Sequence, residues 1–284
     1  DVDIRALPVD DMRRSAWIHL DRFSTAWIPA WPNADAYLSN AEFAEVATFY
    51  FGLPSPACAN LVGERIGSTR SVLDVYGCKL TALQLPGDGW RTQHDAIKWR
   101  LTKDMQEMHV RARTEVFGLL SACIPQAGRA RLGNQPLRKR QGLVPDFLVH
   151  VPWEGPERPM LFELKTLHFG TSTYGNRTRR CEAVARRSRA LHGEYIAKAR
   201  HVDTTYCGTT EGDVGPVQLR LQSFGTVHGL VFGAYAEGSK DARGLVAQLA
   251  ASRASRDWAC LGCRDQKEAA ATLARYLYRS WCIL

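Results

Sequence analysis

The sequence predicts a mixed α/β fold, in which helices flank a central sheet and a helical segment precedes them. Helix-length stretches and short apolar runs follow one another in the order helix, strand, strand, strand, helix, strand, which is typical of such a domain. The 284 residues are 45% hydrophobic, enough for one substantial core or two modest ones. We expect residues 1–90 to form a helical and irregular segment and residues 91–284 to form the α/β domain.

The N-terminal segment is expected to begin with amphipathic helices over residues 11–50, whose many aromatic side chains are typical of a core. Pro29 and Pro32 interrupt this pattern. Ser39-Asn40-Ala41-Glu42 predicts a helix start, because Ser or Asn ahead of an acid can cap a helix. Residues 54–89 are rich in Gly, Pro and Ser, and we expect them to be irregular.

The elements of the second part follow from the spacing of apolar residues. Ile97, Leu101, Met105 and Met108 predict an amphipathic helix over residues 93–109. The apolar runs on either side of a Pro-rich turn predict an antiparallel hairpin, which a basic loop precedes. The expected strands are 110–117, 147–151, 160–167 and 226–236, and the later helices are 179–200, 241–255 and 266–281.

Basic residues are in excess, with a formal net charge of +8 and a pI of about 9.2. Arginine predominates over lysine in two stretches, which suits forked contacts to phosphate oxygens. We interpret the stretches as a nucleic-acid-binding surface, and a solvated face is the alternative. No run of eighteen apolar residues occurs, so we expect no membrane partner. The stretches are Arg129, Arg131, Arg138, Lys139 and Arg140, and Arg177, Arg179, Arg180, Arg186, Arg187 and Arg189.

The eight cysteines are scattered and do not form the dense framework of a small secreted domain, so we expect a reducing, intracellular compartment. Cys260 and Cys263 form half of a zinc-ligand pattern. Structural zinc normally takes four ligands, and two ordinary thiols near a helix start are the favoured interpretation.

The residues that carry chemistry lie on the expected hairpin, in Val144-Pro145-Asp146-Phe147 and Phe162-Glu163-Leu164-Lys165. Alternation along a strand places Glu163 and Lys165 on one face, while Phe162 and Leu164 face the core. Hairpin pairing can bring Asp146 beside Glu163. Two close carboxylates are unfavourable unless a cation lies between them, and Mg²⁺ prefers such oxygen ligands.

This pattern of PD followed by ExK predicts a metal-dependent nuclease. Asp146, Glu163 and the backbone carbonyl of Leu164 are the expected ligands of Mg²⁺ or Mn²⁺, which would polarise a phosphate and activate water. Lys165 would orient the attacking water or neutralise charge on the phosphate. An ordinary Glu–Lys pair on a surface hairpin is the alternative.

The arrangement resembles the restriction-like endonuclease domain, of the PD-(D/E)xK superfamily, in site-specific non-LTR retrotransposon proteins. The likeness covers roughly Gly87 to the end of the chain. In this family the domain nicks target DNA so that the exposed 3′ end primes reverse transcription. The similar stretches are Gln93-His94-Asp95, Arg113-Thr114-Glu115, Val144-Pro145-Asp146, Phe162-Glu163-Leu164-Lys165, residues 194–200, Tyr206, Gly215-Pro216-Val217 and residues 229–234.

The resemblance implies a restriction-endonuclease-like core, a nuclear location, a DNA partner and, through the rest of a larger retroelement protein, RNA. It implies Asp146 and Glu163 as metal ligands, with Lys165 or the helical Lys198 near the scissile phosphate. Supporting roles fall to Glu115 and Tyr206. The expected DNA contacts are Arg138, Lys139, Arg140, Arg177, Arg179, Arg180, Arg187 and Tyr206.

Several alternatives stay open at this point. The family usually carries a zinc knuckle ahead of the nuclease core, but only Cys58 and Cys78 remain here, so we expect no zinc or a degraded site. The chain could be a catalytically inactive nucleic-acid-binding or structural module, or a junction-resolving nuclease, on the same fold. His94 could be catalytic, although a helix-capping Asp95 with a neighbouring His is favoured. Lys198 could simply pair with Glu194 one helical turn away.

Overall fold

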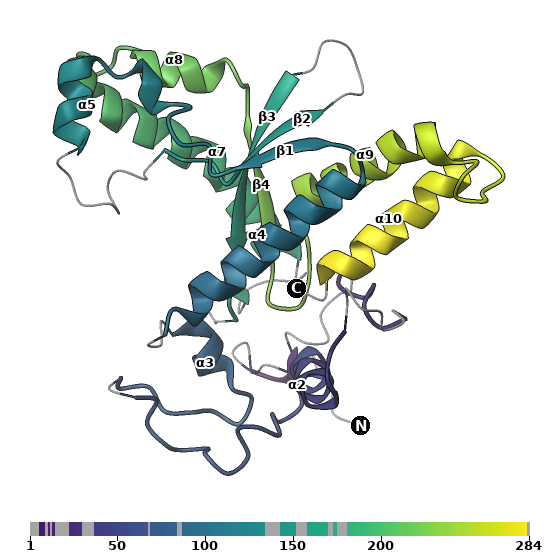
Figure 1. The fold of residues 1–284 in the computed structure, drawn as a ribbon. Coiled ribbons are helices and arrows are strands. Elements are labelled where there is room, and N and C mark those ends of the chain that lie inside the picture. The colour runs from purple at the N-terminus through teal and green to yellow at the C-terminus, as the bar shows by residue number, and fades with distance from the viewer. Residues whose placement is uncertain are drawn as a thin grey trace.

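The computed structural model describes residues 6–8, 11, 13–14, 23–29, 37–67, 69–83, 87–133, 143–151, 158–169, 173–174 and 181–282. Within these residues the chain forms a four-stranded sheet with helices on both faces, as Figure 1 shows. The expectation of a mixed α/β fold, with helices around a central sheet, is confirmed at this level.

The sheet has the strand order β1-β2-β3-β4. Its strands are β1 (Arg111–Thr114), β2 (Phe147–Val151), β3 (Arg158–Thr166) and β4 (Val227–Phe232). β1, β2 and β3 pair antiparallel, whereas β4 runs parallel to β3. The hairpin expected from the sequence is therefore confirmed as β2 and β3. A parallel pair needs a long crossover connection, and helices supply it here.

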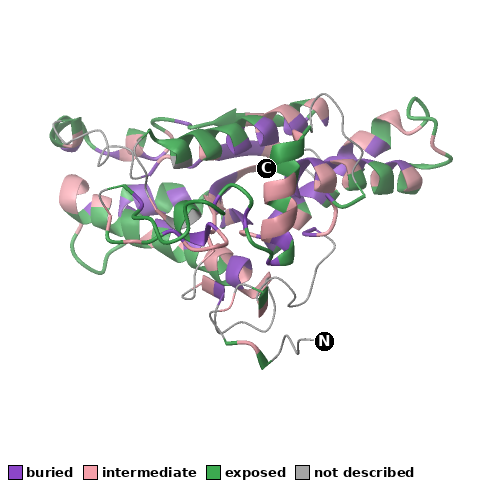
Figure 2. Cartoon of the chain, turned by 90° about the horizontal axis from the view of Figure 1, so that it is seen from below, coloured by how far each residue is buried: buried purple, intermediate pink, exposed green. Residues whose placement is uncertain are grey.

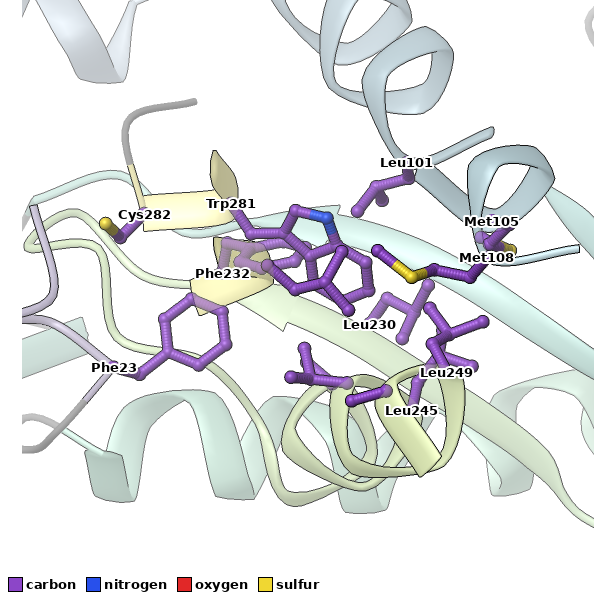
Figure 3. Packing of buried hydrophobic residues seen from close by; sticks show 14 of the residues in the cluster. Phe23, Leu101, Met105, Met108, Leu230, Phe232, Leu245, Leu249, Trp281 and Cys282 are labelled. Atoms are coloured by element: carbon purple, nitrogen blue, oxygen red, sulfur yellow. The ribbon is translucent and has the colours of Figure 1, made fainter. Parts of the chain in front are cut away.

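One face of the sheet is covered by α4 (Gly89–Glu107), α9 (Lys240–Asp257) and α10 (Gln266–Cys282). The four apolar positions that predicted α4 are all buried in this layer, together with the sheet residues Phe147 and Phe162. In Figure 3, Trp281 lies against Phe232, between side chains of α4 and α9. The apolar periodicity of α4 therefore predicted its buried face correctly.

The opposite face carries a second buried cluster, to which Leu148 and Leu161 belong. Its helices include α5 (Gln126–Gly133), α7 (Cys181–Val202) and α8 (Pro216–Gln222), with a 3-10 turn, η2 (Ser121–Cys123), and a π turn, η4 (Asp203–Cys207). Figure 2 shows buried and exposed residues in alternation along the helices, as for helices with one buried face. The prediction of a basic loop before β2 was incomplete, because α5 forms within it.

The N-terminal part contributes to the main core. α2 (Asn40–Phe51) begins at the predicted helix start, and a capping box forms there: the Ser39 side chain accepts from the Glu42 amide and Glu42 accepts from the Ser39 amide. Phe23, Trp27 and Tyr50 are buried in the same cluster as α4 and α10. The aromatic stretch therefore does form core, although Tyr37 and Phe43 are exposed.

Several boundaries differ from the predictions, and β4, expected to reach residue 236, ends at Phe232. α4 begins at Gly89 rather than at residue 93, after Asp88, so His94 and Asp95 lie inside the helix. The expectation that Asp95 caps this helix is therefore wrong. β1 ends at Thr114, because Glu115 adopts a left-handed backbone conformation with φ of 46°. The irregular segment contains a short helix, α3 (Cys78–Ala82).

Among the described residues, no helix is both long and apolar enough to cross a membrane.

Candidate catalytic centre

Three acidic residues lie in a row across the sheet: Glu115 just after β1, Asp146 just before β2 and Glu163 within β3. Phe147 pairs with Phe162, so Asp146 and Glu163 occupy the next opposed positions on β2 and β3. The Glu115 amide donates to the Asp146 carbonyl at 3.1 Å, which places Glu115 beside Asp146 at the end of β1. Glu163 in turn pairs with Gly229 on β4. Strand pairing alone therefore brings together three carboxylate-bearing residues that lie far apart in the sequence.

Asp146 is almost completely buried, with 9% of its surface exposed. One carboxylate oxygen accepts from the Leu164 amide at 2.9 Å and lies 3.8 Å from His94 Nε2. The other oxygen lies 3.1 Å from Lys98 Nζ. Burial raises the pKa of Asp146, but hydrogen bonding to His94, the charge of Lys98 and the Leu164 amide together lower it to about 2. Asp146 is therefore held as a carboxylate.

Lys98 links two of the three acids. Its ammonium lies 2.8 Å from Glu115 Oε1 as well as 3.1 Å from Asp146 Oδ1. Burial lowers the pKa of Lys98, whereas the hydrogen bond to Glu115 and the charge of Asp146 raise it, with a net increase. Sequence reasoning missed Lys98, because a lysine next to the apolar Ile97 resembles one on a solvated helix face. Only the packing of α4 against β1 and β2 reveals this contact.

Glu163 is held from both sides. Lys165 Nζ lies 2.5 Å from one carboxylate oxygen, so Lys165 points to the same side of the sheet as Glu163, as predicted. The Tyr195 hydroxyl on α7 donates to the other oxygen at 2.6 Å. Burial and the neighbouring charge of Glu163 raise the pKa of Tyr195 far above its ordinary value, so Tyr195 remains a donor.

Gly229 allows α7 to approach this closely. A Cβ atom at Gly229 would come within 2.9 Å of the Ser188 Cα atom on α7. Tyr195 lies two helical turns beyond Ser188 on the same helix. Gly229 stands directly beside Glu163 in the sheet, so the close approach of α7 to β4 brings the Tyr195 hydroxyl to the acidic row.

The alternative in which Lys198 pairs with Glu194 is not what the structure shows. The Arg187 guanidinium holds Glu194 instead, with Nη2 and Oε2 3.1 Å apart. Lys198 Nζ lies over the ring of Tyr195, 5.4 Å from its centroid. The alternative of a local Glu194–Lys198 pair is therefore wrong, because Glu194 pairs with Arg187, two turns earlier in α7. Lys198 thus contacts Tyr195, and the Tyr195 hydroxyl in turn donates to Glu163.

The predicted DNA contacts are only partly described. Arg138, Lys139, Arg140, Arg177, Arg179 and Arg180 lie outside the described residues. Arg187 is described, but its guanidinium is engaged by Glu194. Tyr206 is partly buried against the second cluster, with Arg131 over its ring at 5.8 Å. The expected DNA-facing role of Tyr206 gains no support from this position.

The acidic row offers carboxylate oxygens, the donor atoms that a hard cation such as Mg²⁺ prefers. Asp146 and Glu163 supply carboxylate oxygens on adjacent strands, and Mg²⁺ is commonly held by one or two carboxylates while it keeps several waters. In the described part of the chain, no group of three or more His, Cys, Asp or Glu side chains is arranged to hold a metal. Asp146 contacts Leu164 through the amide, so the predicted carbonyl ligand stays a prediction.

Comparisons with known proteins found no similar protein, so a function can be argued only from the residues of the site. No protein-family model, no curated protein and no solved structure matches this chain. The resemblance to retrotransposon endonucleases therefore remains a prediction from the motif residues.

The lowered pKa of Asp146 predicts a loss of stability in acid. The folded-state pKa lies below the ordinary value of 3.8, so the stabilisation is present above pH 3.8 and is lost as the pH falls towards 2. The expected contribution is about 2 kcal/mol. Urea unfolding of wild type and Asp146→Asn between pH 7 and pH 2.5 measures it: the difference between them should shrink in acid. A difference that is constant with pH would contradict the ion pairs described for Asp146.

Proposed function

We propose that this chain is a metal-dependent DNA endonuclease of the PD-(D/E)xK type, which hydrolyses phosphodiester bonds. The observation that carries the proposal is the placing of Asp146 and Glu163 at opposed positions of β2 and β3, with Lys165 on the same side. By the resemblance, the chain is one domain of a larger retroelement protein that nicks target DNA in the nucleus for integration.

Asp146 and Glu163 are the proposed ligands of Mg²⁺ or Mn²⁺. A bound metal supplies a Lewis acid for the phosphate and lowers the pKa of bound water. The chain itself provides the surrounding charges. Lys165, which is one-third exposed, can leave Glu163 to contact the scissile phosphate. Tyr195 keeps the Glu163 carboxylate in place, and Lys98 balances Asp146 and Glu115.

One observation favours a second candidate, a nucleic-acid-binding or structural module that does not cleave. Each carboxylate of the row already has a cationic partner within 3.1 Å, from Lys98 or Lys165. Such a network can serve the fold alone, because a buried charge must be paired. The two candidate functions differ in whether the protein cleaves DNA when a divalent cation is added.

A plasmid-nicking assay separates them. We expect supercoiled DNA to be converted to the nicked or linear form with Mg²⁺ or Mn²⁺, and to remain intact when EDTA removes the metal. Calcium is a useful third arm, since it binds oxygen ligands but demands a different coordination number and geometry. Equal conversion with and without EDTA would show that any cleavage is not metal-dependent, and intact DNA under all conditions would favour the non-cleaving module.

A further inference from the structure

A groove of about 590 Å³ lies beside β1. This strand is at one edge of the described sheet (Figure 1). Two arginines, Arg111 and Arg113, and two histidines, His109 and His150, are among the residues that line the groove. No Asp or Glu is among the described residues that line it. Asp257 contacts His109 at 3.7 Å, at the end of the groove near α9. The groove is therefore a basic surface, and none of its residues is among the DNA contacts that the sequence predicted.

The strand β1 connects the groove with the acidic row, since Arg113 lines the groove and Glu115 follows two residues later. Arg111 and Arg113 alternate along β1 with Ala112, which packs towards the main core, so both arginines point to the opposite face. Two residues of an antiparallel strand rise about 7 Å, roughly the separation of successive phosphates on a nucleic-acid strand. The alternation of β1 ends at Thr114, and Glu115, the end of the acidic row, lies two residues beyond Arg113. A chain of phosphates laid along β1 past Arg113 would thus come close to the end of the candidate catalytic centre.

Basic residues on an edge strand can also serve purposes that involve no nucleic acid. Charged side chains there prevent pairing with the edge of another sheet, which needs no ligand. A peptide could add as a further strand, but such recognition depends on backbone hydrogen bonds and side-chain pockets more than on charge. The side chains of Arg111 and Arg113 line one groove, and His150 lies opposite Arg111 on β2, so the charge is concentrated there. Concentrated charge favours a polyanion.

We propose that this groove binds the sugar-phosphate backbone of the nucleic acid whose phosphodiester lies at Asp146 and Glu163, with Arg111 and Arg113 on successive phosphates. The inference rests on the proposed function for the identity of the ligand. In this proposal, the nucleic-acid strand next to the cleavage site runs along the groove. Because phosphate contacts carry no sequence information, it gives affinity and register rather than sequence preference.

The test is the salt dependence of DNA binding in EDTA, where cleavage does not interfere. Fluorescence anisotropy with a labelled duplex of about three helical turns is measured for wild type and for the double variant Arg111→Gln/Arg113→Gln at several salt concentrations. Lys240→Gln/Arg275→Gln is the matched control, because it removes two charges from α9 and α10 outside the groove. Circular dichroism checks that each variant folds.

We expect the groove variant to lower the magnitude of the slope of log K against log salt by about two units, one for each phosphate contact. The control should change the slope by much less. An equal slope for wild type and the groove variant, or an equal change in both variants, overturns the inference, as does a wild type that binds no DNA. Nicking with Mg²⁺ is measured separately. If the wild type binds DNA through the groove but does not nick it, the proposed function is contradicted and the proposal that the groove binds DNA stands.

Discussion

The variant Asp146→Asn is expected to lose at least about 10³-fold of the nicking rate. Asparagine has the shape of aspartate and can still accept from the Leu164 amide, but it carries no charge to attract a metal or to balance Lys98. Loss of metal-based stabilisation of a phosphoryl transition state costs several kcal/mol, and about 4 kcal/mol corresponds to 10³-fold. The measurement is the initial rate of plasmid nicking with saturating Mg²⁺.

Folding must be separated from chemistry in this experiment, because Asp146 also supports the structure. Asp213→Asn is the control, since this carboxylate is exposed in the loop before α8. Urea unfolding at pH 7 should show Asp146→Asn to be weakened by about 2 kcal/mol, less than the total stability of most domains. A folded Asp146→Asn protein that nicks at the wild-type rate would remove Asp146 from the centre.

The hairpin at the centre could be predicted from the sequence because its information is local. Phe147 and Val149 on one strand, and Phe162 and Leu164 on the other, are apolar positions at a spacing of two on either side of a Pro-rich turn. This spacing fixes which face is buried and thereby sets the register that opposes Asp146 and Glu163. The capping box at Ser39 is local in the same sense, since all its hydrogen bonds join residues three apart.

The rest of the centre depends on packing between distant elements. Lys98 and His94 reach Asp146 only because α4 crosses the strand ends, and nothing in their immediate sequence marks this approach. The spacing on the helix offered Lys198, one turn away, as an alternative partner of Glu194, whereas the longer Arg187 side chain pairs with Glu194 from two turns away. Which of two basic residues pairs with one carboxylate depends on the length and surroundings of their side chains. The spacing of the residues along a helix does not reveal either.

The two lysines near Glu163 should differ strongly when each is replaced by alanine. Lys165→Ala is expected to lower the nicking rate by roughly 10²–10³-fold while DNA binding is retained, as for loss of one well-placed transition-state donor. Lys198 lies over the Tyr195 ring and reaches Glu163 only through the Tyr195 hydroxyl. An exposed cation–π contact contributes about 0.5–1 kcal/mol, so Lys198→Ala should lower the rate by no more than about fivefold.

Single-turnover nicking and anisotropy with the same duplex measure rate and binding for both variants. If Tyr195 transmits the effect of Lys198, then Tyr195→Phe, which removes the hydrogen bond to Glu163, should make a further Lys198→Ala change nearly silent. The opposite order of effects, with Lys198→Ala inactive and Lys165→Ala nearly active, would assign the active lysine to α7. The carboxylate pair of Asp146 and Glu163 would then still hold the metal, and the lysine at the phosphate would come from α7 rather than from β3.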